Sequence, residues 1–176
     1  MTIRIAMWSG PRNISTAMLR SWENRPDTYV CDEPLYAHYL NETGIEHPGR
    51  KEVIESGETD WKKVTNELIE KNPENRMIFY QKHMTHHLLP NIERGWMKKL
   101  KNCFLIRDPK EVILSYSKTR SEFTIEDIGI LQQKEIFDYV VEMESENPPI
   151  IDSKEVLENP KRILKALCKR LEIPFY

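Results

Sequence analysis

Five short apolar runs, separated by helical or irregular segments, constrain the fold of this chain more than any other feature. The runs are IRIAMW (3–8), TYVCDE (28–33), RMIFYQK (76–82), NCFLIRD (102–108) and PPIIDS (148–153). They are nearly continuous rather than alternating, which is typical of strands covered on both faces of a parallel sheet. The pattern predicts an α/β fold in three layers, with a central, mostly parallel sheet flanked by helices. Ligands of such sheets usually bind beyond the carboxyl ends of the strands.

Length and charge narrow the classes of function. The 176 residues suit one domain, which we expect to span 1–176. A formal net charge of -2 gives no global basic field, so any anion site is local and a nucleic acid partner is not expected. Three widely spaced cysteines suit reduced thiols in a cytoplasmic protein. The first apolar run ends at Gly10, which predicts neither a signal peptide nor membrane insertion. The oligomeric state is left open.

Helical spacing recurs in the second half of the chain. Asp108 followed by Pro109 is a good helix start, and PKEVILSYSK continues it. Residues 125–144 and 159–173 also have helical spacing. The least regular region, NETGIEHPGRKEVIESGETD (41–60), is polar and contains glycines, and we predict a mobile insertion or lid there.

The loop SGPRN after the first run precedes a helical pattern. A helix that begins directly after a loop presents unpaired amides and a positive dipole end, which suits a phosphate. Ser15 and Thr16 add hydroxyl donors and Arg12 adds a charged fork. A nucleotide triphosphatase loop has glycine and lysine before its hydroxyl residue, where this chain has Ile14 and Ser15. ATP cleavage with magnesium is therefore not expected, and by itself the loop could also be an ordinary turn.

A second polar group follows the fourth run. Arg107 ends that run, and Ser115 lies eight residues later, two turns into the next predicted helix. This spacing allows the guanidinium and the hydroxyl to converge on one phosphate. The alternative is an arginine paired with Asp108 or another neighbour on the surface.

These two motifs resemble the sulfotransferases that use 3'-phosphoadenosine-5'-phosphosulfate (PAPS). PRNISTAML is similar to the family's 5'-phosphosulfate loop, and RDPKEVILS has the spacing of its 3'-phosphate site. The family's fold is of the P-loop type, and the ENP segment near the C-terminus extends the similarity over nearly the whole chain. The resemblance implies that PAPS is the co-substrate. Its 5' side would be bound by Arg12, Asn13, Ser15 and Thr16, and its 3' side by Arg107 and Ser115.

Two departures from the family pattern accompany the resemblance. Ile14 stands in the place of the usual loop glycine. The sequence ends at EIPFY, where sulfotransferases often continue into a glycine-rich segment over the nucleotide, so we expect that the covering segment is missing.

Candidates for the catalytic base lie after the second and third runs. In YQKHMTHHLLP, His83 fits the histidine that sulfotransferases of small alcohols carry, with Lys82 as a donor to the transferred group. An unperturbed imidazole titrates near neutrality and can take a hydroxyl proton. Glu33 competes, because some sugar sulfotransferases use a glutamate there; we favour His83. His83, His86 and His87 have the spacing of one helical face, but no nearby cysteine or carboxylate completes a zinc site, so no metal is expected.

The sequence thus predicts transfer of a sulfuryl group from PAPS to a hydroxyl or amine of a small-molecule acceptor. Its identity is left open; candidate pocket residues are Tyr36, His38, Tyr39 and Trp61, although aromatic residues at helical spacing are more often core. Two alternatives remain. One is a nucleotide-binding or interaction module that has the same fold without transfer activity, and the other is a small-molecule kinase.

Overall fold

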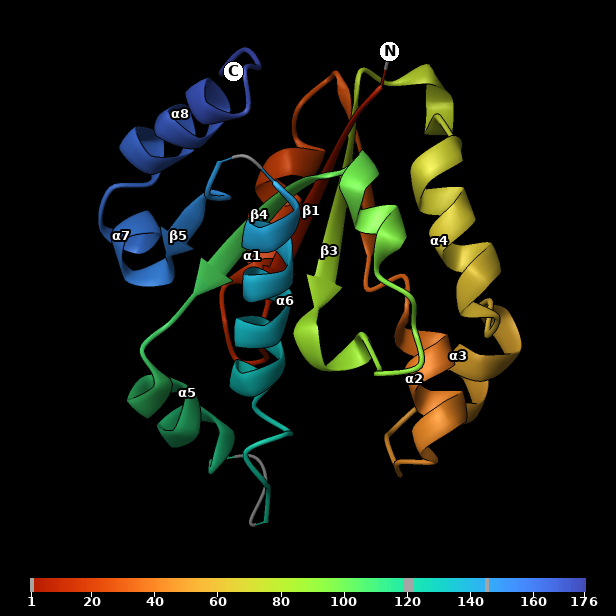
Figure 1. Ribbon diagram of the computed structural model, residues 1–176. Helices are drawn as coiled ribbons and strands as arrows, with labels where there is room; N and C mark the ends of the chain where they lie inside the picture. The colour runs from red at the N-terminus through yellow and green to blue at the C-terminus, as the bar shows by residue number, and fades with distance from the viewer. Residues whose placement is uncertain (1, 119–121, 145) are drawn as a thin grey trace.

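The structure is a computed structural model that describes residues 2–118, 122–144 and 146–176. Its centre is a five-stranded sheet in the order β2-β3-β1-β4-β5, in which each neighbouring pair is parallel (Figure 1). The strands are β1 (Ile3–Ser9), β2 (Thr28–Asp32), β3 (Ile78–Met84), β4 (Lys101–Ile106) and β5 (Ile150–Asp152). Each overlaps one of the five apolar runs, and the predicted α/β class with a parallel sheet is confirmed.

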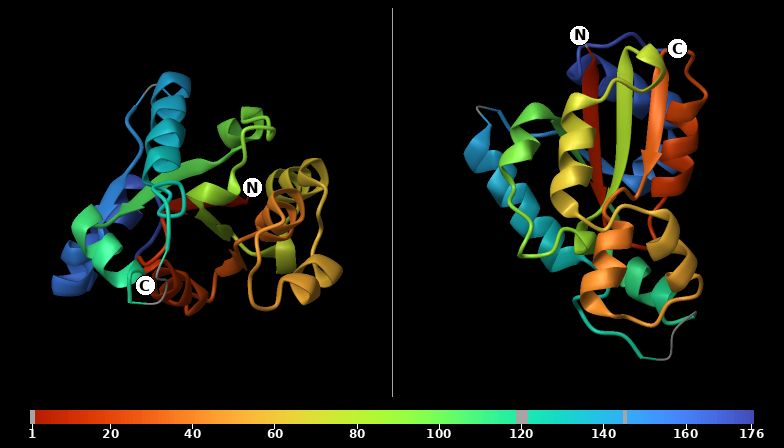
Figure 2. Two further views of the ribbon diagram at one scale, coloured as in Figure 1. Left: turned by 90° about the horizontal axis from the view of Figure 1, so that it is seen from below. Right: turned by 90° about the vertical axis from the view of Figure 1, so that its right-hand side faces the viewer.

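Helices cover both faces of this sheet. They are α1 (Ser15–Glu23), α2 (Tyr36–Thr43), α3 (Arg50–Ser56), α4 (Trp61–Glu70), α5 (Pro109–Tyr116), α6 (Ile130–Met143), α7 (Ser153–Glu158) and α8 (Pro160–Arg170). Short 3-10 turns are η1 (Pro73–Asn75), η2 (Thr85–His87) and η3 (Gly95–Lys99). In the left view of Figure 2, α1 and α6 lie on opposite sides of the sheet, which gives the three predicted layers. No helix in the described ranges is long and apolar enough to cross a membrane.

The core has two parts, one on each face of the sheet. Side chains of α1, α7 and α8 pack on one face, where the Trp22 and Tyr80 rings stack at 5.0 Å. Side chains of α4, α6 and η3 pack on the other face around Trp8 and Phe104. Because successive strand residues point to opposite faces, the neighbours Lys82 and His83 in β3 belong to different layers.

The segment 41–60 is more regular than predicted. It contains the end of α2, the whole of α3 and Asp60, whose side chain caps α4 through the Lys62 amide at 2.9 Å. The Arg50 guanidinium donates to the Leu40 carbonyl at 3.2 Å, and a Cβ on Gly57 would lie 2.6 Å from the Ala37 Cβ. These contacts hold α3 against α2, so the segment is helical where an irregular region was expected, and a mobile lid stays a prediction.

The predicted helix 125–144 begins later, at Ile130. Gly129 has a φ of +65°, a left-handed conformation that favours glycine. The Thr85 hydroxyl donates to the Gly129 carbonyl at 2.8 Å, and a Cβ on Gly129 would lie 2.7 Å from that hydroxyl oxygen. A long-range contact therefore decides where α6 begins, and local helical spacing could not reveal it.

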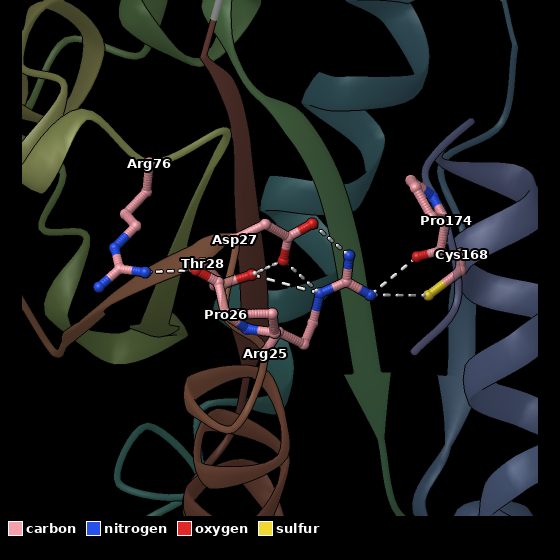
Figure 3. Close-up of polar contacts among 7 residues, drawn as sticks. All are labelled: Arg25, Pro26, Asp27, Thr28, Arg76, Cys168 and Pro174. Atoms are coloured by element: carbon pink, nitrogen blue, oxygen red, sulfur yellow. Dashed lines mark hydrogen bonds and ion pairs between the residues drawn. The ribbon is translucent and has the colours of Figure 1, made fainter.

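Arg25, between α1 and β2, joins the start of β2 to the C-terminal residues (Figure 3). Its Nε and Nη2 donate to the two carboxylate oxygens of Asp27 at 3.0 and 2.9 Å, and Nε also reaches the Thr28 hydroxyl at 3.3 Å. Its Nη1 donates to the Pro174 carbonyl at 2.9 Å and approaches the Cys168 sulfur at 3.7 Å. This buried guanidinium, 8% exposed, holds the end of the chain against the sheet.

Candidate functional site

The predicted site residues lie at the carboxyl edge of the sheet, where the loops after β1, β2, β3 and β4 begin. Figure 1 shows α2, α5 and the turn after β3 beyond the arrowheads of the strands. Parallel pairing of all four strands makes these loops neighbours, although their residues are far apart in the sequence.

The loop after β1 leads into the N-terminus of α1. The N-cap residue is Ile14, and no side chain caps the helix. The amides of its first turn therefore point out of the helix without the side-chain acceptor that Ser, Thr, Asp or Asn supplies at other helices. Ser15 is buried and Thr16 is exposed at this end. Arg12 has a φ of +57°, an uncommon conformation for a residue with a side chain.

Arg12, Arg107 and Ser115 are brought together from three segments. The Arg12 Nε donates to the Ser115 Oγ at 3.1 Å, and the Arg107 Nη1 donates to the Arg12 carbonyl at 2.6 Å. Arg107 also pairs with Glu111 one turn along α5, Nε to Oε2 at 3.1 Å, and not with Asp108. Asp108 instead caps α5 by accepting from the Lys110 amide at 2.8 Å. The Arg12 guanidinium thus bonds the Ser115 hydroxyl, and the Arg107 guanidinium bonds the Arg12 main chain and Glu111, in the loop that leads into the uncapped end of α1.

Asn13 and Gln133 hold this edge in shape. The Asn13 Nδ2 donates to the Leu105 carbonyl at 3.0 Å, and its Oδ1 accepts from the Ile14 amide at 2.8 Å. The Gln133 Nε2 donates to the same Leu105 carbonyl at 3.0 Å and to the Trp8 carbonyl at 3.2 Å. The Asn13 side chain, predicted to bind the nucleotide, therefore ties the loop after β1 to the end of β4.

Lys82 is buried between two carboxylates at the end of β2. Its Nζ lies 2.7 Å from the Asp32 Oδ1 and 2.7 Å from the Glu33 Oε1, and its side chain is 4% exposed. Burial lowers the pKa of Lys82, but the hydrogen bonds to Asp32 and Glu33 outweigh it, and the net pKa is raised above its ordinary value. Lys82 is therefore a charged ammonium at neutral pH. Glu33, 27% exposed, has a φ of +48° and donates its amide to the Lys82 carbonyl at 3.0 Å.

His83 lies inside the core and not at the edge. It is 1% exposed, stacks on the Trp8 ring at 4.4 Å and lies 5.8 Å from the Trp96 ring. Its Nε2 is 3.2 Å from the Gln81 Oε1, and Gln81 in turn donates to the Leu68 carbonyl. Burial lowers the pKa of His83 to about 3, so the imidazole is neutral. Lys82 and His83, predicted side by side, thus point to different layers.

A cavity of about 170 Å³ lies next to the loop after β1. Its lining residues are Pro11, Glu33, Tyr36, Tyr39, Leu40, Ile45, His47, Met84, His86, His87, Tyr116 and Asp127. Of the three predicted catalytic residues, only Glu33 is among them. Tyr36 and Tyr39 line it as the sequence allowed, whereas His38 is buried with its Nδ1 2.8 Å from the Thr59 carbonyl.

Asp127 and Tyr116 are cavity residues that sequence reasoning missed. Tyr116 follows Ser115 directly at the end of α5, so the prediction that Ser115 binds a phosphate could have pointed to Tyr116 as well. Asp127 lies in a turn before α6 and carries no motif. In the part of the chain that the structure describes, no group of three or more histidine, cysteine, aspartate or glutamate side chains is placed to hold a metal ion.

Comparisons with known proteins give the family and the fold of this chain. A family model described as a sulfotransferase domain matches residues 3–176. Two curated proteins of Arabidopsis thaliana, branched-chain-amino-acid aminotransferase-like proteins 2 and 1, are 33% and 34% identical over 171 residues, or 97% of this chain. The chain spans only 30% of the length of each.

Solved structures share the fold at low sequence identity. The sulfotransferase domain of the curacin biosynthetic pathway is 15% identical, with a TM-score of 0.58 over 100% of this chain and 76% of that one. A mouse sulfotransferase complexed with PAP is 12% identical, with a TM-score of 0.55 over 99% of this chain and 60% of that one. Shikimate kinase from Bacteroides thetaiotaomicron, 14% identical, has a TM-score of 0.54 over 97% of this chain and 99% of that one.

Proposed function

Because this chain belongs to the sulfotransferase-domain family, we propose that it moves a sulfuryl group from PAPS to a hydroxyl of a small acceptor. The observation that carries the proposal is the meeting of Arg12, Arg107 and Ser115 at the uncapped N-terminus of α1, beside a cavity that contains Glu33. An anion site and an acceptor cavity that share the loop after β1 are what group transfer between two substrates requires.

The residues present fit a bisphosphorylated nucleotide. First-turn amides of α1 and the hydroxyls of Ser15 and Thr16 are suited to the 5' side. The Arg107 guanidinium and the Ser115 hydroxyl are suited to the 3' side, because charged forks bind phosphate oxygens in pairs. Arg12, predicted for the 5' side, donates to Ser115, so we assign it to the 3' side as well. The mouse sulfotransferase of the same fold was crystallised with PAP, the desulfonated product, which is consistent with this choice of nucleotide. When bound, PAPS supplies the activated sulfuryl group.

Glu33 is the proposed base in place of His83. The acceptor hydroxyl forms a new O–S bond, the bond between sulfur and the 5'-phosphate oxygen breaks, and the PAP phosphate leaves with that electron pair. The acceptor proton goes to Glu33, whose Oε1 is held by Lys82, so that Oε2 is the receiving atom. Neutral His83 is enclosed by Trp8 and Trp96 and does not reach the cavity.

Titration calorimetry with PAP tests the nucleotide assignment, with ATP and magnesium as the comparison ligand. We expect PAP to bind and ATP to bind much more weakly. Arg107→Ala should raise the Kd for PAP by about 10- to 100-fold, since hydrogen bonds to charged groups contribute about 1.5–3 kcal/mol. The matched control is Arg20→Ala, which removes an exposed arginine paired with Glu23 in the last turn of α1.

The outcomes separate the proposal from its alternatives. PAP binding that Arg107→Ala weakens and Arg20→Ala does not would support the nucleotide site. Preference for ATP with magnesium would favour a small-molecule kinase. Binding of neither ligand would contradict the proposal and leave an interaction module with the same fold.

A further inference from the structure

The cavity beside the proposed sulfuryl site has a negative character. Glu33 and Asp127 contribute carboxylates, and among the described residues that line it none is lysine or arginine. Lys82 lies just outside the lining, but it is shared by Asp32 and Glu33, so this group of three charges sums to -1. Asp127, from the turn before α6, adds a second negative charge to the cavity lining.

Asp127 is held in position by its own turn and by the loop after β1. The Thr124 amide and hydroxyl donate to its Oδ2 at 2.8 and 3.3 Å, so Oδ1 is the oxygen on which a ligand contact would be built. The next residue, Ile128, lies so close to Gly10 that a Cβ on Gly10 would be 2.9 Å from the Ile128 carbonyl oxygen. This close approach places the Asp127 turn against the phosphate loop.

Aromatic rings form much of the remaining wall. Tyr36, Tyr39 and Tyr116 line the cavity. His87 stacks with Tyr36 at 4.8 Å and with Tyr39 at 4.7 Å. Electron-rich rings next to carboxylates are the groups that proteins use to hold ammonium ions, by cation–π attraction and ion pairing.

His87 supplies a hydrogen-bonding atom that the described residues leave unused. It is 3% exposed, and its Nδ1 has no hydrogen-bond partner among them. Burial, with smaller effects from His86, Lys82 and other neighbours, lowers the pKa of His87 well below its ordinary value, so the ring is neutral. A buried polar atom without a partner is costly, and a small turn of the ring toward the cavity that His87 lines would let a ligand hydroxyl or a water satisfy it.

We propose that the acceptor is a small amino alcohol, whose ammonium group lies between Asp127 and the tyrosine rings and whose hydroxyl lies beside Glu33 and His87. The cavity volume of about 170 Å³ lies below the range of about 300–1,000 Å³ typical of pockets for drug-sized ligands, which favours a small acceptor. This inference rests on the proposed sulfuryl transfer and names its acceptor class. The ammonium group is not consumed; the oxygen forms the O–S bond and its proton goes to Glu33.

Two pairs of matched probes test the inference by calorimetry on the protein saturated with PAP, at about pH 8, where imidazoles are ordinarily neutral. Choline is compared with 3,3-dimethylbutan-1-ol, which has carbon in place of the charged nitrogen. In the second pair, which covers primary amines, ethanolamine is compared with propan-1-ol. We expect the cation of at least one pair to bind about tenfold or more tightly than its neutral partner, and Asp127→Asn to remove that preference.

The control variant is Glu135→Gln, the same type of change on the outer surface of α6, where Glu135 pairs with Arg94. It should leave the preference intact. Equal binding within both pairs, or a preference that survives Asp127→Asn, would overturn the inference. PAP binding is measured first in the same cell. If PAP does not bind, the proposed function has failed; if PAP binds, the later titrations test the acceptor class alone.

Discussion

Arg25 and Lys82 are two buried cations near opposite ends of β2, and their surroundings differ in a way that separates structure from chemistry. Arg25 is closed in by Asp27 and the Pro174 carbonyl, with the Trp22 ring at 5.3 Å and the Tyr176 ring at 4.8 Å from its guanidinium carbon. Lys82 is also paired, but one of its two carboxylates lines a cavity. Burial and charge pairing alone therefore do not mark a functional site.

The two cations also differ in the kind of contact that they make. The Arg25 guanidinium is a planar fork that binds both Asp27 oxygens and fixes them, as Figure 3 shows. The Lys82 ammonium is a point charge shared between two carboxylates from adjacent positions. Sharing permits Glu33 to gain a proton while Asp32 keeps the ammonium paired. We infer that Arg25 holds the fold together and that Lys82 supports a reacting group.

The largest expected effect is on turnover in Glu33→Gln. Loss of a general base lowers kcat by about 10²- to 10⁴-fold. Unfolding should change little, because Asp32 still pairs Lys82. The measurement is PAP released from PAPS with the acceptor that the paired titrations select, beside thermal unfolding.

Asp32→Asn is the matched control for that variant, because Asp32 bonds the same ammonium but does not line the cavity. It should retain most of the activity. Equal losses in the two variants would mean that the charge on Lys82, and not a base at Glu33, limits the reaction.

A smaller effect, on stability alone, is expected for Arg25→Ala. Breaking a buried ion pair costs about 3 kcal/mol or more, because Asp27 loses its partner while the Pro174 carbonyl loses its donor. Urea unfolding should report this loss, while the Kd for PAP stays unchanged.

Lys82→Met is the counterpart of Arg25→Ala, because it changes the cation that supports the proposed base. It should reduce turnover as well as stability, since Glu33 loses the group that holds it. If Arg25→Ala weakened PAP binding as strongly as it reduced stability, the division between a structural and a functional cation would be wrong.

The smallest effect is on the pH dependence of stability and concerns His83. This side chain is buried like Arg25 and Lys82, but it is neutral whereas they are charged. Its pKa is lowered to about 3 in the folded chain, against an ordinary 6.5, so the unfolded chain binds the proton more readily. The contribution of neutral His83 to the free energy of unfolding is therefore complete above pH 6.5 and is lost as the pH falls from there toward about 3. By about pH 4 the loss should approach 3 kcal/mol.

His83→Gln lacks this titration, so its unfolding free energy should fall less steeply than that of the parent chain between about pH 6.5 and 4. Urea unfolding at several pH values measures both slopes. Identical slopes would show that the imidazole protonates inside the folded chain, and would return His83 to the candidates for the base.

Local patterns predicted much of the fold. The apolar runs located all five strands, and Asp108 with Pro109 marked the start of α5. The expected irregularity of 41–60 and the expected start of a helix at 125 were wrong, because Gly57 and Gly129 act through contacts with Ala37 and Thr85. The residues next to each glycine in the sequence do not reveal either contact.

The candidate site divides in the same way. The spacing of Arg107 before α5 and Ser115 within it, and the position of Arg12 after β1, predicted neighbours that the structure links through Arg12. Asn13 was assigned to the nucleotide, but its side chain bonds the Leu105 carbonyl of a strand far along the chain. Asp127 was not predicted, since its turn reaches the cavity only through the contact of Ile128 with Gly10.

The sequence by itself determined that this chain forms a parallel α/β sheet and that its polar loops share one edge, because apolar runs and helical spacing are local properties. The tertiary structure alone decided what each face of β3 meets. Period-two alternation sends Lys82 and His83 to opposite layers. Only the packing of Trp8 and Trp96 buries His83, and only the end of β2 and the turn after it give Lys82 its two carboxylates. A side chain's chemistry follows from its neighbours, and those neighbours come from distant parts of the chain.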